Sequence, residues 1–173
     1  LSDLASITAN MPGHDCAPDI LRRVLPAEIT DKVMRIPSHH LAHAYSAYWP
    51  SGFDEALVFV ADATGSTTPA HYTESYTLYE GREQTITTLH NEMVAAHLAQ
   101  LSTLGFVYEY ITRKAGFVTQ VGEKIQHAEA GKLMGLASFG KQQPNWHRWI
   151  KIAEDSFSLK ISAYDIFLEV AAL

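Results

Sequence analysis

The spacing of apolar positions between residues 56 and 90 predicts three consecutive β-strands. Residues 56–62, ALVFVAD, form a continuous apolar run of strand length that ends in an acid, which is typical of a buried strand. Residues 74–81 and 85–90 alternate and are rich in Thr and Tyr, with Gly81 between them. Three such strands in succession favour a meander.

Helical patterns flank these strands on both sides. Ser38 occupies an N-cap position, and the helix that it begins extends to about Tyr48, before Pro50. Residues 1–10 also have a helical pattern, which Pro12 and Gly13 end. The remaining predicted elements are helices at 19–25, 92–114, 124–138 and 145–155, a short strand at 157–161 and a closing helix at 163–173. This mixture of strands and long helices favours the α/β class.

The composition is that of a protein with its own hydrophobic core. The 173 residues are 47% hydrophobic and carry a formal net charge of -6, with no run of Lys or Arg that would suit nucleic acid. No apolar stretch reaches the roughly 20 residues that span a bilayer. Cys16 is the only cysteine, which fits a reducing cytoplasm. Because the first residue is Leu rather than Met, we expect a fragment or a processed product.

The segment HHLAH at residues 39–43 carries the clearest candidate chemistry. On a helix, His39 and His43 lie on one side, as in helical HxxxH zinc sites, whereas His40 is rotated by about 100°. A zinc-peptidase mechanism would require Glu at position 40, where this chain has His. With nine histidines in the chain, an ordinary helix with hydrogen-bonded imidazoles stays open as the alternative.

Asp62 strengthens the case for a metal. It ends the predicted strand, and ligands commonly lie at strand ends in α/β sheets. Two imidazoles and one carboxylate suit iron, manganese or zinc. The alternative is that Asp62 only caps a turn.

Two glycine-containing segments are candidate phosphate or nucleotide contacts. Gly65 and Ser66 lie in a turn whose backbone N–H groups could meet a phosphate, although an ordinary turn is the alternative. Gly131 and Gly135 stand one helical turn apart and suggest close approach by a ligand or another backbone. Lys132 could add a charge for a phosphate, but tight helix packing with a solvated lysine explains this segment equally well.

Three blocks together resemble the O-carbamoyltransferase family, which includes nodulation-factor and antibiotic-tailoring carbamoyltransferases. They are SHHLAHAYSAYWPSGFDEALVFVADATGS, LGFVYEYITRKAGF and EAGKLMGLASFG, and they span about residues 36–141. The resemblance implies part of one lobe of an actin/Hsp70/sugar-kinase ATPase fold, with a mixed sheet and flanking helices. Because family members are several hundred residues long, it also implies that residues 1–173 are a piece of the large domain and inactive alone.

The chemistry of this family gives specific expectations. Its members use carbamoyl phosphate and ATP to make carbamoyladenylate, and they pass the carbamoyl group to a hydroxyl of a small molecule. By this resemblance His39, His43 and Asp62 bind a divalent metal, most often iron, with zinc or manganese as alternatives. Gly65 belongs to the phosphate-facing turn, and the helix with Gly131, Lys132 and Gly135 lines the nucleotide.

Some points stay open at this stage. His40 is the nearest candidate base for the acceptor hydroxyl. The family usually has Gly after the strand-end Asp, where this chain has Ala63, whose Cβ limits the approach of a phosphate. Alternatives are a relative of the proteins that transfer threonylcarbamoyl to tRNA, and a non-catalytic, His-rich metal-binding module. No membrane partner is expected, and the oligomeric state is undetermined.

Overall fold

The computed structural model describes residues 7–9, 17–123, 125–141, 146–153 and 157–172. The chain divides into two compact units, Leu1–Ala96 and His97–Leu173, and each unit is considered by itself. Within the described residues no helix is both long and apolar enough to cross a bilayer. A cytoplasmic location stays a prediction.

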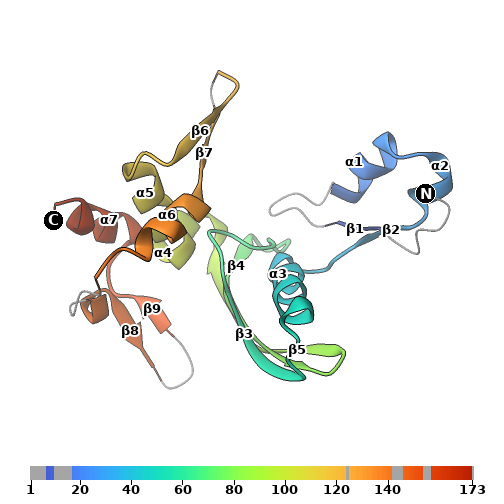
Figure 1. Cartoon of the computed structure of the whole chain (residues 1–173), viewed down its shortest axis with the longest axis horizontal. Coiled ribbons are helices and arrows are strands. Elements are labelled where there is room, and N and C mark those ends of the chain that lie inside the picture. Colours follow the sequence, from blue (N-terminus) through green and yellow to red (C-terminus); the bar gives the residue numbers. More distant parts are fainter. Residues whose placement is uncertain (1–6, 10–16, 124, 142–145, 154–156, 173) are drawn as a thin grey trace. The chain divides into compact units, whose positions relative to one another are not determined.

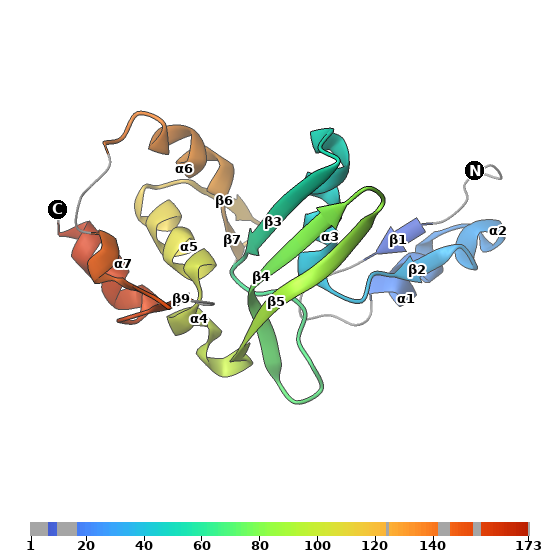
Figure 2. The same cartoon turned by 90° about the horizontal axis from the view of Figure 1, so that it is seen from below.

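The described residues of the first unit form two sheets and three α-helices, which are drawn in Figures 1 and 2. A parallel pair joins β1 (Ile7–Ala9) to β2 (Val33–Arg35). The larger sheet is antiparallel and has the order β3-β4-β5. The strands of this sheet are β3 (Glu55–Ala61), β4 (Tyr72–Arg82) and β5 (Thr85–Ala95). The helices of the first unit are α1 (Ala17–Val24), α2 (Ala27–Thr30), α3 (His39–Tyr48) and the short 3-10 helix η1 (Trp49–Ser51).

Helix α3 covers one face of the three-stranded sheet (Figure 1). The sheet supplies alternate residues to this contact, because side chains along a strand point to opposite faces. Val58 and Val60 of β3 therefore pack under the helix, whereas Leu57 and Phe59, which alternate with them, are exposed. The buried core residues of this contact are Ala44, Tyr48, Val58, Val60 and Tyr79.

Tyr48 and Gly81 make the tightest contact between α3 and the sheet. A Cβ at Gly81 would lie 2.6 Å from carbon atoms of the Tyr48 ring, so the ring requires glycine beneath it. The Tyr48 hydroxyl donates to the carbonyl oxygens of Asp54 and Glu83, at 2.8 and 3.2 Å. The end of α3 is thereby fixed to the turns at one end of the sheet.

The described residues of the second unit form short helices and two antiparallel strand pairs. Helix α5 (Leu104–Lys114) begins at the N-cap Thr103 and packs against α7 (Ala163–Ala171) through Tyr110 and Phe167. Its other elements are the 3-10 helices η2 (Ala96–Leu98, which begins at the unit boundary) and η3 (Trp146–Arg148), the helices α4 (Ala99–Ser102) and α6 (Ala130–Ala137), and the strands β6 (Val118–Val121), β7 (Ile125–Ala128), β8 (Ile150–Ile152) and β9 (Phe157–Leu159).

The structure confirms the meander, α3, the helix near residue 20, β9 and α7, and it corrects four other elements. Residues 7–9 are a strand rather than helix because they pair with β2, which is distant in sequence; residues 1–6 of that prediction lie outside the described part. Residues 92–95 continue β5. The predicted helix at 124–138 is a strand followed by α6, since β7 pairs with β6 across Gly122, whose φ is +65°. Around 150 the alternating IKI sequence forms β8 instead of helix.

The α/β class holds in its coarse form, since the chain mixes helices with strands. The three-stranded sheet is antiparallel throughout, and the parallel pairing in the described residues is that of β1 with β2. The predicted "buried strand" is β3, and it is buried on one face only.

We expect Gly81→Ala to lower the free energy of unfolding by about 1–3 kcal/mol, because the added methyl group overpacks the Tyr48 ring. Gly131→Ala is the control. No described atom lies within 4 Å of its added Cβ, and the gain in helix propensity should leave stability unchanged or raised by up to ~1 kcal/mol. Urea denaturation of the intact protein measures both. Equal stability of the two variants would contradict this packing.

Candidate metal centre

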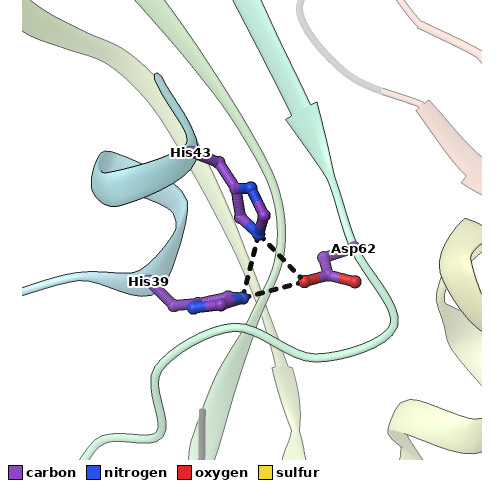
Figure 3. A group of neighbouring side chains, drawn as sticks. All are labelled: His39, His43 and Asp62. Carbon is purple, nitrogen blue, oxygen red and sulfur yellow. Dashed lines mark hydrogen bonds and ion pairs between the residues drawn. The ribbon is translucent and has the colours of Figure 1, made fainter. Parts of the chain in front are cut away.

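Two neighbouring elements bring His39, His43 and Asp62 together (Figure 3). The two histidines lie one turn apart on α3, whose N-cap Ser38 accepts a hydrogen bond from the Leu41 N–H. Asp62 follows β3, which packs directly under this helix. The sequence therefore places the two histidines on one face of a helix and the aspartate at the end of the adjacent strand.

The three ligand atoms converge on one point (Figure 3). His39 Nε2 lies 3.0 Å from Asp62 Oδ2, and His43 Nε2 lies 3.5 Å from the same oxygen. The two Nε2 atoms are 3.0 Å apart. The other carboxylate oxygen, Oδ1, accepts the Ala63 N–H at 2.7 Å, which fixes the carboxylate with Oδ2 toward the imidazoles.

This geometry fits a metal ion better than it fits protons alone. Around an ion with bonds of about 2.1 Å, neighbouring donor atoms lie roughly 3.0–3.4 Å apart in octahedral or tetrahedral arrangements. Two of the observed separations are 3.0 Å and fall in that range, and the third, 3.5 Å between His43 Nε2 and Asp62 Oδ2, lies just above it. A neutral imidazole Nε2 either donates or accepts, so hydrogen atoms cannot give all three contacts a good hydrogen bond at once. A cation would satisfy the three lone pairs together.

The charge of Asp62 suits the same role. Its pKa is held below the usual range, chiefly by the hydrogen bond from His39, with a further contribution from the Ala63 N–H. Partial burial opposes these effects, and the positive charge of protonated His39 or His43 would add to them. The carboxylate is therefore ionised at neutral pH, as a metal ligand must be.

The turn after Asp62 forms hydrogen bonds to neighbouring parts of the protein. Gly65 N–H donates to the Glu74 carbonyl at 3.0 Å, and Ser66 N–H donates to the Glu74 carboxylate at 2.8 Å. The Ser66 hydroxyl accepts the His39 N–H at 2.9 Å. A phosphate at this turn would therefore need donors other than these two N–H groups. Gly65 is required here because a Cβ would lie 2.5 Å from the Glu74 carboxylate.

His40 is fully buried, which argues against its predicted role as a base for an acceptor hydroxyl. The Thr77 hydroxyl donates to Asn91 Oδ1 at 3.2 Å, so it accepts from His40 Nδ1 at 2.8 Å. His40 Nε2 then carries the lone pair, and it has no hydrogen-bond partner among the described residues. Burial lowers the pKa of His40, against the opposing charges of Glu74 and Asp62.

Comparison with known proteins now decides the family. Residues 4–164 match the family model described as carbamoyltransferase N-terminus. The chain belongs to this carbamoyltransferase family. The match extends beyond the blocks at 36–141 that carry the resemblance. An uncharacterized protein of Synechocystis sp. is 34% identical over 128 residues, which cover 70% of this chain and 18% of that protein. The chain thus spans less than a fifth of this relative's length.

The residues that the family resemblance predicts to line a nucleotide lie on α6, in the second unit. Gly131 and Gly135 are exposed, and no described atom lies within 4 Å of a Cβ at either position. The close approach inferred for them is therefore absent within this unit. The Lys132 ammonium forms an ion pair with Glu129, one turn before it. This helix face is open, and its role toward a nucleotide stays a prediction.

Sequence patterns did not reveal Glu74. It stands in the alternating β4 segment, where an acidic residue reads as solvent-exposed, yet it is 4% exposed. A register shift between Glu74 and Tyr76 and the packing of the turn at Gly65 produce this burial, and neither leaves a local signal.

The burial of His40 predicts a pH dependence in the metal-free protein. Its pKa is lower in the folded than in the unfolded state, so the folded state binds fewer protons and stability is lost as pH falls below the ordinary value of about 6.5. We expect the urea midpoint of the chelator-treated protein to fall between about pH 7.5 and 5.5. His40→Asn, whose amide can still donate to Thr77, should show a smaller fall, whereas His127→Gln at an exposed position should behave like wild type. Identical pH profiles for wild type and His40→Asn would refute this.

Proposed function

We propose that this chain is part of an ATP-dependent enzyme that transfers a carbamoyl group from carbamoyl phosphate, through carbamoyladenylate, to a hydroxyl of a small molecule. Membership of the carbamoyltransferase family supports carbamoyl transfer in general. The observation that carries the finer proposal is the convergence of His39, His43 and Asp62 on one point. These residues would hold a divalent cation, with iron as the first candidate and zinc or manganese as alternatives.

Such a cation would supply Lewis acidity toward the carbonyl and phosphoryl oxygens of the carbamoyl donor. The protein's own contribution is a rigid site. Asp62 and the two imidazoles come from a helix and a strand that share a core, so their separation is set before any ligand arrives. Preorganisation of this kind orients reactants and lowers the barrier to transfer between them.

The acceptor is proposed to be a small molecule rather than tRNA. The chain has 13 Lys and Arg against 19 Asp and Glu, and its sequence has no basic run. Strong binding to tRNA depends on several phosphate contacts from cationic side chains. The buried position of His40 removes it as the base for the acceptor, and no other described residue is assigned that role.

The reaction has a defined stoichiometry that an assay of the intact protein can follow. Hydrolysis of carbamoyl phosphate would release phosphate and leave carbamate, whose oxygen would attack the α-phosphorus of ATP and displace pyrophosphate. Transfer of the carbamoyl group from this adenylate to the hydroxyl, which loses its proton, would then release AMP. We expect pyrophosphate release that requires carbamoyl phosphate.

The variant His39→Ala/His43→Ala should lose most bound metal and at least about 100-fold in activity, because the site loses two of its three ligands. His127→Ala, in the second unit, is the control. Elemental analysis measures the metal content, and an unchanged content in the double variant would contradict the metal assignment. Pyrophosphate release that does not depend on carbamoyl phosphate would contradict the proposed reaction.

The open face of α6 allows a clean test of nucleotide binding. The Cβ that Gly135→Val adds would lie in open space, and valine is no worse than glycine in a helix interior. The variant should therefore keep its melting temperature, while its affinity for ATP falls at least about 10-fold if α6 lines the nucleotide. Isothermal calorimetry on the intact protein measures the affinity. Normal ATP affinity in the folded variant would remove α6 from the proposed site.

A further inference from the structure

We propose that Glu74, which is not a member of the ligand set, is a positioning residue that fixes the helix bearing His39 and His43 against the turn that follows Asp62. This inference rests on the proposed metal site and names the group that sets its geometry. Glu74 lies on β4, and its side chain is buried. A buried carboxylate is costly unless hydrogen bonds satisfy it, and both oxygens of Glu74 accept such bonds.

One carboxylate oxygen, Oε1, holds the start of α3. It accepts the Ser38 hydroxyl hydrogen at 2.5 Å, and the same Ser38 oxygen accepts the Leu41 N–H at 3.0 Å. The other oxygen, Oε2, lies 3.4 Å from the His40 nitrogen, as the acceptor of a long hydrogen bond. A negative charge at this place also favours the helix, whose N-terminus carries a partial positive charge.

The second oxygen also holds the turn. Oε2 accepts the Ser66 N–H at 2.8 Å, and the backbone of Glu74 exchanges hydrogen bonds with Gly65 N–H and the Ser66 carbonyl. The Ser66 hydroxyl then accepts the His39 N–H at 2.9 Å. One carboxylate and one hydroxyl therefore connect the backbone of a histidine ligand to the turn that begins at Asp62.

The chemistry of these contacts requires a carboxylate. Each group named above that contacts the Glu74 carboxylate is a hydrogen-bond donor, and an ionised carboxylate offers only acceptor sites. Glutamine would turn an NH2 group toward one of these donors, leaving two hydrogen atoms face to face. Neighbouring space is equally restricted, because a Cβ at Gly65 would overlap Oε2. Loss of the charge should therefore loosen the helix and the turn relative to each other.

The test measures Co²⁺ binding to the intact, metal-free protein, followed by the visible absorption of the bound ion. Outer partners of metal ligands commonly contribute 10–100-fold in metal affinity, so the Kd of Glu74→Gln should rise by about that factor, with an altered Co²⁺ band. Glu80→Gln, on the same strand but half-exposed, should match wild type. Gly81→Ala controls for stability alone: it weakens the packing of the same strand without touching the site, and it should bind Co²⁺ like wild type.

A second pair of variants keeps the proposal testable if Glu74→Gln does not fold. Ser66→Ala removes the acceptor of the His39 N–H and should raise the Kd about 10-fold, while Ser66→Thr restores the hydroxyl and most of the affinity. A wild-type Kd in both Glu74→Gln and Ser66→Ala would overturn the positioning role while leaving the metal site intact. Absence of Co²⁺ binding by the wild type would overturn the metal site and this inference with it.

Discussion

The burial of one carboxylate between a helix start and a turn constrains how α3 lies against the three-stranded sheet. Glu74 can be buried only if Ser38, Ser66 and the N-terminal turn of α3 all reach it with their donors. Helix, turn and strand must therefore adopt their final positions together. The core beneath α3, with Tyr48 seated on Gly81, fixes the other end of the helix in the same way. His39 and His43 lie in the first two turns of α3, beside the Glu74 contacts, so those contacts limit their movement most directly.

This arrangement explains why a site can form from residues of ordinary type. His39 and His43 share a helix face through their spacing alone, but Asp62 meets them because β3 packs under that helix and the following turn folds back on Glu74. The three ligand atoms then approach each other at distances suited to a cation. The assignment of the chain to the carbamoyltransferase family gives this geometry a chemical context.

Local sequence patterns predict much of the fold and of the candidate site. The features that they miss depend on contacts between residues far apart in the chain. The N-cap at Ser38, the HxxxH spacing and the acid after an apolar strand predict the helix, the meander and the three side chains that the structure brings together, because each pattern depends on neighbours within a few positions. The strand at 7–9 was misassigned since its partner lies about 25 residues away, as the pairing of Ile7 with Val33 shows. The burial of His40 is hidden from local pattern for a related reason: its hydrogen-bond partner Thr77 lies on β4, 37 residues further along the chain.

X-ray absorption spectroscopy at the metal edge of the intact protein tests the central claim most directly, because it counts the ligands. We expect a first shell of nitrogen and oxygen atoms at about 2.0–2.2 Å, with the outer-shell scattering of two imidazole rings. His43→Ala should reduce that scattering to one ring. A shell without imidazole scattering, or one that is identical in wild type and His43→Ala, would contradict a metal centre built from His39, His43 and Asp62.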